Sequence, residues 1–319
     1  MKNIKVLILP KFEIGTMDSK EIGEAKFFYE EYFKDSEKYN IKGCPNMLYV
    51  KDNLAMMVVG EGKANVAMSL SILFSDARFN FDEAYVISTG CCGSATVDTV
   101  MGDVFVVTDV CDLDFGHTAD IRDIFKESKT FGEEERRTPT WFYDNAFDAY
   151  GHFRLNETLV DKIYESTKNI KLESTEKTRK FMEYTFDNAD WIKREPKVIK
   201  GTTVTSDNYW KGYYGENNAR LVAKTYNCSS PYVSSEMEDS AIAQVMYRFN
   251  RLDRLIVTRV SVNFDVFVKG SSPQALWGYN LDAVDLLISD NSEETADIFV
   301  TAMQNNFKVN KVIIDMLLQ

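Results

Sequence analysis

The 319-residue sequence predicts a layered α/β fold, and three observations support this prediction. Short apolar runs of strand length alternate with longer runs in which apolar residues recur at helical spacing. Glycine-containing turns, Gly60–Gly62 and Gly90–Gly93, follow two of the apolar runs. A chain of this length also buries a sizeable core, which suits helices packed on a sheet. Ligands in such folds bind at the carboxyl ends of the strands, so a site is expected near these turns.

The first third of the chain shows the alternation of strands and helices most clearly. A short apolar run ends at Pro10, and Asp18 and Ser19 are suitable residues to begin the helix that follows. The polar turn Lys51–Asn53 separates two further apolar runs. We expect, in chain order, strand Lys5–Leu9, helix Glu21–Phe33, strands Tyr49–Val50 and Ala55–Val59, helix Lys63–Phe74, and strands Ala84–Ser88 and Val104–Val110.

Charged residues dominate between about residues 126 and 200, and the α/β pattern returns after them. We therefore expect a single domain over residues 1–319 that carries a charged helical insertion at about 126–200. The remaining expected elements are helices Asn156–Thr167 and Thr175–Tyr184, strand Lys197–Val204, helix Ser240–Phe249, strand Leu255–Val262, and closing helices Ser292–Asn306 and Val309–Leu318.

The charge balance excludes some classes of function. The chain carries 37 basic and 49 acidic residues, a net charge of −12, which disfavours binding to nucleic acid or to an anionic membrane. No apolar run approaches the 18 or more residues that span a bilayer, and the apolar run before Pro10 is too short for a signal peptide. We expect no membrane span and a cytoplasmic location.

The cysteines and the missing motifs narrow the chemistry further. The chain lacks a P-loop, an H-E-x-x-H site and a G-x-S-x-G elbow, and Gly60–Gly62 lacks the third glycine of a dinucleotide site. We expect no cofactor. The five cysteines are odd in number and lack zinc-type spacing, so reduced thiols and no metal site are expected. They are Cys44, Cys91, Cys92, Cys111 and Cys228.

Two segments have the residue types of a sugar and anion site. Ser88–Gly93 ends a strand with small hydroxyl residues and glycines, which let the backbone approach a ligand or simply make a tight turn. Glu236, Met237 and Glu238 precede an apolar helix. The two acids are either ordinary helix N-terminal residues or a ribose site, since a carboxylate accepts paired hydrogen bonds from vicinal hydroxyls.

Two other segments have the residue types of a base site. Tyr209 and Trp210 follow polar turn residues after a strand, and they can stack on a flat base or pack locally. In Arg259–Asp265 a hydrophobic strand ends in polar residues. These residues either belong to a ligand site at the same edge of the sheet or form an ordinary turn there.

The order of these segments resembles the nucleoside phosphorylase-I superfamily, whose phosphorylases and nucleosidases cleave ribosides. The longer strings are most similar to the family labelled purine nucleoside permease. The resemblance covers about residues 4–290. The strings that carry it are Gly23–Glu30, Asp114–Asp120, Thr203–Gly212, Glu236–Ala241 and Arg259–Asp265.

The resemblance implies a three-layer αβα sandwich around a twisted mixed β-sheet, in a homo-oligomer (a dimer or trimer) that binds a purine nucleoside. It implies that Glu238 holds the ribose hydroxyls, with Met237 under the sugar and Glu236 assisting. It also implies a base site with Tyr209 and Trp210, which the turn residues Cys91 and Gly93 would complete, and Asn263 at purine N7. Asn at this position resembles phosphorylases that favour 6-oxopurines, so the resemblance implies inosine or guanosine as the expected substrate over adenosine.

Several positions decide between hydrolysis and phosphorolysis. Asn263 donates a hydrogen bond but is no general acid, whereas Asp265 can supply a proton if burial raises its pKa. Ser88 stands where phosphorylases of the superfamily carry a phosphate-binding Arg, and Ser88, Thr89 and Gly90 are similar to the N-T-G turn of the nucleosidases.

The turn at Gly60–Gly62 also resembles the nucleosidases. Gly62 and Lys63 resemble the nucleosidase G-x-G-K turn, and Glu13 lies near the position of a water-activating Glu in those enzymes. The anion or water site is therefore assigned to the two turns, and hydrolysis is favoured. Lys63 is the candidate phosphate ligand if phosphate is a co-substrate.

Two alternatives stay open. The chain can be a nucleoside-binding or uptake component without turnover, as the family label suggests. His117 can line the pocket or, with neighbouring aspartates, bind a metal, although nothing in the resemblance calls for a metal. His152 is expected to be structural or exposed.

Overall fold

The computed structural model describes residues 1–115, 117–118, 141–142, 148–186, 189–266 and 292–319. Its centre is a mixed ten-stranded sheet with the order β11-β8-β12-β13-β7-β2-β5-β4-β3, while β14 pairs with β7 and β8. The strands are β2 (Val6–Leu9), β3 (Glu37–Tyr39), β4 (Leu48–Lys51), β5 (Leu54–Met57), β7 (Tyr85–Ser94), β8 (Val104–Asp112), β11 (His152–Arg154), β12 (Val198–Thr205), β13 (Tyr232–Glu236) and β14 (Leu255–Phe264). Two short pairs lie outside it: β1 (Lys2–Asn3) with β6 (Phe79–Asn80), and β9 (His117–Thr118) with β10 (Trp141–Phe142).

Strand β14 closes part of the sheet on itself. It runs parallel to β7 on one side and antiparallel to β8 on the other, so that β7, β13, β12, β8 and β14 form a closed circuit. The pairing is interrupted between Ser261 and Asn263, where β14 has a bulge against β7. A bulge turns successive side chains to a new direction, and this one lies at the carboxyl end of the strand.

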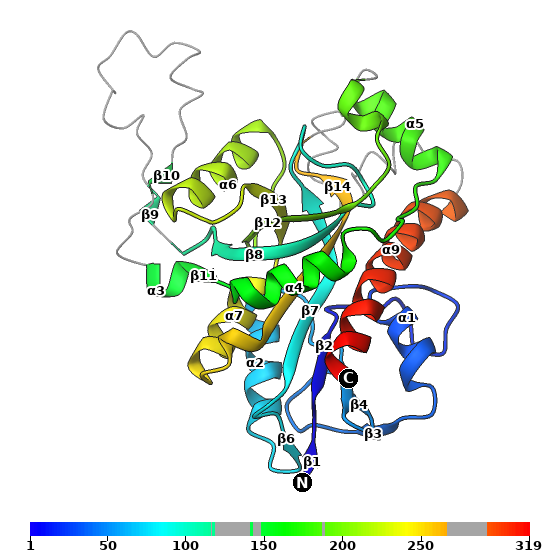
Figure 1. Cartoon of the computed structure of the whole chain (residues 1–319), viewed down its shortest axis with the longest axis vertical. Helices are drawn as coiled ribbons and strands as arrows, with labels where there is room; N and C mark the ends of the chain where they lie inside the picture. Colours follow the sequence, from blue (N-terminus) through cyan, green and yellow to red (C-terminus); the bar gives the residue numbers. More distant parts are fainter. Residues whose placement is uncertain (116, 119–140, 143–147, 187–188, 267–291) are drawn as a thin grey trace.

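Helices cover both sides of this sheet. In Figure 1, α2 and α7 lie on one side of the central strands β7 and β2, and α9 and α1 lie on the other. Helix α6 packs on β12 and β13, whereas α4 packs on β8, β12 and α9. The helices are α1 (Lys26–Phe28), continued by a π-helical turn at Tyr29–Phe33, α2 (Lys63–Phe74), α3 (Asp148–Gly151), α4 (Glu157–Thr167), α5 (Glu176–Thr185), α6 (Tyr213–Thr225), α7 (Asp239–Arg248) and α9 (Ser292–Leu318). Short 3₁₀ turns occur at Asp190–Lys193 and Leu252–Arg254.

The central strands are apolar along their whole length because both of their faces are covered. Every residue of β2, β5 and β8 is buried. Leu159, Val160 and Ile163 of α4 belong to the same core, so this helix covers the sheet although it lies within the predicted insertion. Within the predicted insertion, residues 126–140, 143–147 and 187–188 lie outside the described residues.

The prediction of two closing helices was wrong, because one helix, α9, runs through Lys308. The sequence contains no Pro or Gly there to end it. Asn306 and Asn310, which lie on either side of the predicted break, are buried. Asn306 and Asn310 donate hydrogen bonds to the Thr89 hydroxyl at 2.8 and 3.1 Å. Their polar groups are satisfied by tertiary contacts, which sequence periodicity does not report.

Candidate active site

A cavity of about 120 Å³ opens at the carboxyl ends of β7, β13 and β14. Residues from distant parts of the chain line it: Lys11, Phe12, Glu24, Glu61, Cys91, Cys92, Gly93, Ser206, Asn208, Tyr209, Trp210, Ser235, Glu236, Met237, Glu238, Arg259, Val262 and Asn263. This is the edge of the sheet at which the sequence predicts a ligand.

Arg259 is the central residue of the cavity floor. It stands in β14, and only 1% of its surface is exposed. Its guanidinium donates to Glu236 at 3.0 Å, to Glu238 at 3.1 Å and to Asp239 at 2.8 and 2.9 Å. It also donates to the Cys91 carbonyl at 3.1 Å. A buried guanidinium keeps its charge and holds several carboxylates in one plane, so Arg259 fixes the three acids that enter α7.

The three acids play different parts at the start of α7. The Glu236 carboxylate accepts hydrogen bonds from the amides of Glu238 and Asp239, both at 2.7 Å, and thereby satisfies the free donors of the helix N-terminus. Burial and the neighbouring Asp239 raise the pKa of Glu236 to about 8, against the opposing effect of Arg259. Burial acts to raise the pKa of Asp239 as well, but Arg259 and Lys11 hold it below its usual value.

Glu238 reaches across to the glycine turn after β5. One of its oxygens accepts a hydrogen bond from the Gly62 amide at 3.1 Å. Gly62 has a φ of +83°, a left-handed conformation that favours glycine, and this conformation aims its amide at the carboxylate. Glu238 is 4% exposed and lines the cavity together with Met237. The predicted ribose residues therefore lie together.

A second buried cation, Lys11, lies beside the floor. Its ammonium donates to the carbonyls of Leu9 and Thr89, at 2.9 and 3.0 Å, and to the Ser88 hydroxyl at 2.7 Å. Ser88 in turn donates to Asp239 at 2.5 Å. Burial and the charge of Arg259 lower the pKa of Lys11. Two cations, Arg259 and Lys11, thus meet three carboxyl groups on this floor, and acidic groups that outnumber the cations favour a positive charge in a ligand.

Glu24, rather than Glu13, is the carboxylate from the N-terminal segment that lines the cavity. Glu24 accepts hydrogen bonds from the amides of Lys11 and Cys91, both at 2.7 Å, and burial raises its pKa. Glu13 is not among the lining residues, and it accepts hydrogen bonds from the amides of Gly23, Ile14 and Ala25. The predicted placement of Glu13 at the site is corrected accordingly.

The predicted anion turn also differs from expectation. Ser88 and Thr89 are fully buried behind the cavity, where they bond to Lys11 and to the asparagines of α9. Gly90 lies against the Glu24 carboxylate, and a Cβ on Gly90 would collide with it. These residues position Glu24 and Lys11 and do not face the cavity themselves.

Lys63 is likewise not available as an anion ligand at the cavity. Its ammonium forms ion pairs with Asp112 at 3.0 Å and Asp114 at 2.8 Å, and it is not among the lining residues. Its amide donates to Asp207 at 2.8 Å. Lys63 therefore ties the start of α2 to the ends of β8 and β12.

The mouth of the cavity carries the predicted base residues. Tyr209 is 61% exposed, while Trp210 packs beside the apolar residues of α6. The Asn263 amide donates to the Tyr209 hydroxyl at 3.0 Å. Because β14 has its bulge at this point, the adjacent residues Val262 and Asn263 both line the cavity.

Asp265 lies one layer behind the cavity. It is buried and accepts hydrogen bonds from the hydroxyls of Tyr232 and of Ser235, the latter at 2.6 Å. Burial raises the pKa of Asp265 to about 6. A Cβ on Gly93 would collide with this carboxylate, so Gly93 is needed for the close approach. Of the two alternatives left open by the sequence, Asn263 faces the cavity and Asp265 supports its wall.

The cysteine turn and His117 complete the predicted set. Cys91, Cys92 and Gly93 line the cavity, and burial raises the pKa of both thiols well above the usual value, so neither is a ready nucleophile. His117 lies in β9, but its side chain falls outside the described residues.

Sequence reasoning missed Lys11 and Glu24 and gave Arg259 no role. Glu24 and Arg259 both lie inside strings that carry the family resemblance, so their positions were signalled. Lys11 gave no signal, because a lysine that follows a strand is normally solvated. Only the meeting of β2, β7 and β14 buries it.

Comparison with known proteins gives consistent relatives. A family model described as purine nucleoside permease (NUP) matches residues 3–319. A probable purine nucleoside permease of Schizosaccharomyces pombe is 25% identical over 67% of this chain, and a purine nucleoside permease of Candida albicans is 25% identical over 66%. The chain spans 65% and 54% of the lengths of these two relatives.

Proteins with enzyme names also match. A 5′-methylthioadenosine/S-adenosylhomocysteine nucleosidase of Oceanobacillus iheyensis is 24% identical over 82% of this chain and 93% of its own. The structure of the Neisseria meningitidis protein of that name has a TM-score of 0.55 at 15% identity, covering 98% of this chain and 99% of the other. Futalosine hydrolase of Helicobacter pylori has a TM-score of 0.56 at 15% identity, covering 98% of both chains. These likenesses confirm the predicted nucleoside phosphorylase-type fold.

In the described part of the chain, no helix is both long enough and apolar enough to cross a membrane.

Proposed function

The chain belongs to the purine nucleoside permease family, and we propose that it cleaves purine nucleosides at the N-glycosidic bond by hydrolysis. The observation that carries this proposal is the convergence of three carboxyl groups, from Glu24, Glu236 and Glu238, on one cavity with a hydrogen-bond donor, Asn263, at its mouth. Glycosidic cleavage needs this combination, because the sugar gains positive charge while the leaving group gains negative charge.

Glu238 is the ribose ligand in this proposal. Its carboxylate is buried, already oriented by Arg259 and the Gly62 amide, and has lone pairs left for the vicinal hydroxyls of a sugar. Met237 provides an apolar contact beneath the ring. Glu236 orients Glu238 through its amide, and burial together with the neighbouring Asp239 raises the pKa of Glu236 to about 8.

Glu24 is the group that activates water. It lines the cavity, and burial raises its pKa toward the pH at which a general base works best. Its two backbone hydrogen bonds hold the carboxylate in place without neutralising it. The sequence suggested Glu13 for this part, but Glu13 is bound to three backbone amides away from the cavity lining.

Residues at the mouth of the cavity contact the leaving purine base in this proposal. Asn263 donates a hydrogen bond and can stabilise the electron density that builds on purine N7. Tyr209 offers an exposed ring for stacking on the base. Since Asn263 cannot transfer a proton, water must protonate the departing base, and a slower chemical step than with an acid is expected.

The charges at the cavity favour water over phosphate as the nucleophile. A phosphorylase holds its anion with cations, but both cations that line this cavity are committed to other groups. Arg259 is bound to three carboxylates. Lys11 is bound to one oxygen each of Leu9, Ser88 and Thr89. Phosphate would also meet the negative charge of Glu24 and Glu238.

A product assay tests this proposal. The purified chain is incubated with inosine, guanosine, adenosine and 5′-methylthioadenosine, with and without phosphate, and the sugar product is identified. Free base with free sugar in phosphate-free buffer is the expected result. Free base with the sugar 1-phosphate, formed only with phosphate, would contradict hydrolysis and support phosphorolysis.

Binding without turnover is the second candidate. It is favoured by the family description and by an amide, rather than a carboxylic acid, at the position that faces the base. Saturable nucleoside binding with no released base in either buffer would select this candidate.

A further inference from the structure

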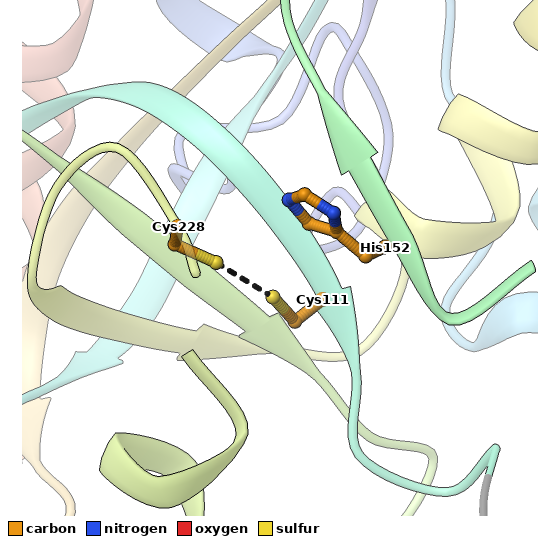
Figure 2. Close-up of side chains that lie close together, drawn as sticks. All are labelled: Cys111, His152 and Cys228. Carbon is orange, nitrogen blue, oxygen red and sulfur yellow. Dashed lines mark hydrogen bonds between the residues drawn. The ribbon is translucent and has the colours of Figure 1, made fainter. Parts of the chain in front are cut away.

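Three side chains outside the active site meet at the edge of the sheet. Cys111 lies near the end of β8, His152 begins β11, and Cys228 follows α6. Figure 2 shows the two sulfurs facing each other with the imidazole ring beside them. Cys228 and Cys111 are 117 residues apart along the chain. The pairing of β8 with β11 and β12 brings these two cysteines and His152 together.

The distances among these groups suit one shared ion. One ligand atom from each residue lies within 4.8 Å of the other two. The two sulfurs are 3.4 Å apart. Two sulfurs bound to one zinc ion at about 2.3 Å each, in tetrahedral geometry, lie about 3.8 Å apart. A disulfide needs about 2.0 Å, so the observed separation of 3.4 Å is much closer to the zinc geometry.

The imidazole ring is held as metal-binding imidazoles usually are. Its Nε2 atom is 2.9 Å from an Asp109 oxygen, and the ring stacks on Tyr226 with centroids 5.4 Å apart. Asp109 is in turn fixed by Arg154 at 3.1 Å and by the Ser229 amide at 3.0 Å. A carboxylate behind the ring sets its tautomer and orientation and increases its basicity toward a metal.

We propose that Cys111, His152 and Cys228 bind one Zn²⁺ ion, with water in the fourth position. Two sulfurs and one imidazole are ligands that zinc prefers, and three protein ligands leave one position of the tetrahedron to solvent. The ion binds two thiolates, so the two thiols release their protons to solvent and the zinc–thiolate unit is neutral.

The position of the site allows an ion to enter and defines what it would join. His152, Tyr226 and Asn227 line a surface hollow beside the cluster. The ion connects β8 to the edge strand β11 and to the turn after α6. Cys111 directly precedes Asp112, which binds Lys63 and the Ser240 hydroxyl, so the zinc ion steadies the segment that leads to the α7 end of the cavity.

Metal content measured on the whole chain tests the site. The protein is dialysed against a chelator, kept reduced with a phosphine, reloaded with Zn²⁺ and desalted, and its zinc content is measured by mass spectrometry. We expect about one equivalent of zinc in the wild-type chain. The matched control is Cys44→Ser, which removes a half-buried thiol distant in the fold and should leave the equivalent unchanged.

Two variants at the less buried ligands, Cys228→Ser and His152→Gln, should each weaken zinc binding at least about tenfold. Circular dichroism checks that both variants remain folded, so that loss of zinc binding can be distinguished from unfolding. Co²⁺ in place of Zn²⁺ should give a sulfur-to-cobalt charge-transfer band in the wild type that weakens in Cys228→Ser. The apparent Tm of the wild type should rise by several degrees with Zn²⁺, and that of Cys228→Ser should not.

Any of three results would overturn the proposal. The first is no zinc uptake by the reduced wild-type chain. The second is an equal uptake in wild type, Cys228→Ser and His152→Gln. The third is a Cys111–Cys228 disulfide in the protein as isolated, with no zinc uptake after its reduction. None of these readouts depends on nucleoside cleavage, so they are separate from the test of the proposed function.

Discussion

The floor and the mouth of the cavity differ in how firmly their side chains are held. On the floor, Arg259 is 1% exposed and donates to three carboxylates, and Lys11 donates to three oxygens. At the mouth, Tyr209 is 61% exposed, and its hydroxyl accepts a hydrogen bond from the Asn263 amide. The floor, which we propose binds the sugar, is therefore organised before a ligand arrives, whereas the mouth, which we propose binds the base, is open to solvent.

This difference separates two tasks. Charge stabilisation needs fixed groups in a dry setting, because groups that must reorganise during the reaction lose much of their effect. Recognition of a purine needs a surface that admits and releases a flat ring, and exposed aromatic and amide groups suit that task. Substitutions on the floor should thus cost stability or rate, and substitutions at the mouth should change affinity by smaller factors.

The largest effect is expected from Arg259→Met. Removing one partner from a buried ionic group leaves uncompensated carboxylates, at a cost of about 3–5 kcal/mol in the free energy of unfolding. Tyr209→Ala is the matched change at the mouth and should cost less than about 0.5 kcal/mol. Urea unfolding of the two variants measures the contrast, and equal costs would contradict it.

Next in size is Glu24→Gln. Loss of the proposed general base should lower kcat by about 10²–10⁴-fold. The amide can accept only one of the two backbone hydrogen bonds that Glu24 accepts, so a loss of about 1–3 kcal/mol in the free energy of unfolding is also expected. Glu13→Gln is the matched control, because Glu13 lies outside the cavity lining and the change likewise leaves one of two accepting oxygens in place. Steady-state kinetics on the preferred nucleoside decide the matter. A larger loss of kcat in Glu13→Gln than in Glu24→Gln would instead make Glu13 the general base, as the sequence suggested.

Glu238→Gln should have an intermediate effect. A charged hydrogen-bonding partner of the ribose hydroxyls contributes about 1.5–3 kcal/mol, so kcat/KM for ribosides should fall by about 10- to 100-fold. The wild type should prefer ribosides to 2′,3′-dideoxyribosides by a similar factor, and Glu238→Gln should lose most of that preference. An unchanged preference in the variant would show that Glu238 does not hold the sugar.

Asn263→Ala tests the mouth. Loss of one donor to the leaving base should lower kcat by about tenfold, at the lower end of the range for such donors, because the amide is partly exposed to water. Asn263→Asp restores a group that can carry a proton, and its rate should rise as the pH falls. Wild-type rates in Asn263→Ala, measured with the same nucleoside, would remove Asn263 from the proposed mechanism.

The smallest effect concerns pH. Burial raises the pKa of Asp265 from its ordinary 3.8 to about 6, so between these values the folded state binds more protons than the unfolded state. Stability from this group is fully present below pH 3.8 and is lost as the pH rises through about 6. Asp265→Asn should therefore flatten the Tm profile in this window. A wild-type profile that rises from pH 4 to 6 and is unaltered in the variant would contradict the assignment.

Much of the fold could be predicted because the evidence for it is local. Helix α2 (Lys63–Phe74) has the predicted bounds, and β8 and β14 extend their predicted strands by two residues each. Helix α6 and strand β13 were not predicted, although the apolar residues of α6 recur at helical spacing, so the sequence did carry a signal for this helix. The break predicted within α9 was wrong, since the segment has no Pro or Gly and its buried asparagines find hydrogen-bond partners at Thr89.

The candidate site divides in the same way. Glu236, Met237, Glu238, Tyr209 and Asn263 were predicted, and all of them line the cavity. The roles predicted for Ser88, Lys63 and Glu13 do not fit their contacts. A sequence shows that a lysine or glutamate is near a strand end, but it does not show which neighbour takes up its charge.

The amino-acid sequence by itself determined the layered α/β fold, the edge of the sheet that holds the site and the family. These depend on local periodicity and on the order of short segments, which one chain displays directly. Only the tertiary structure decided that Glu24 enters the cavity while Glu13 does not, that Arg259 and Lys11 are buried among carboxylates, and that Cys111, His152 and Cys228 meet. Those outcomes depend on which distant segments pack together, because burial and charge pairing arise between strands and not along them.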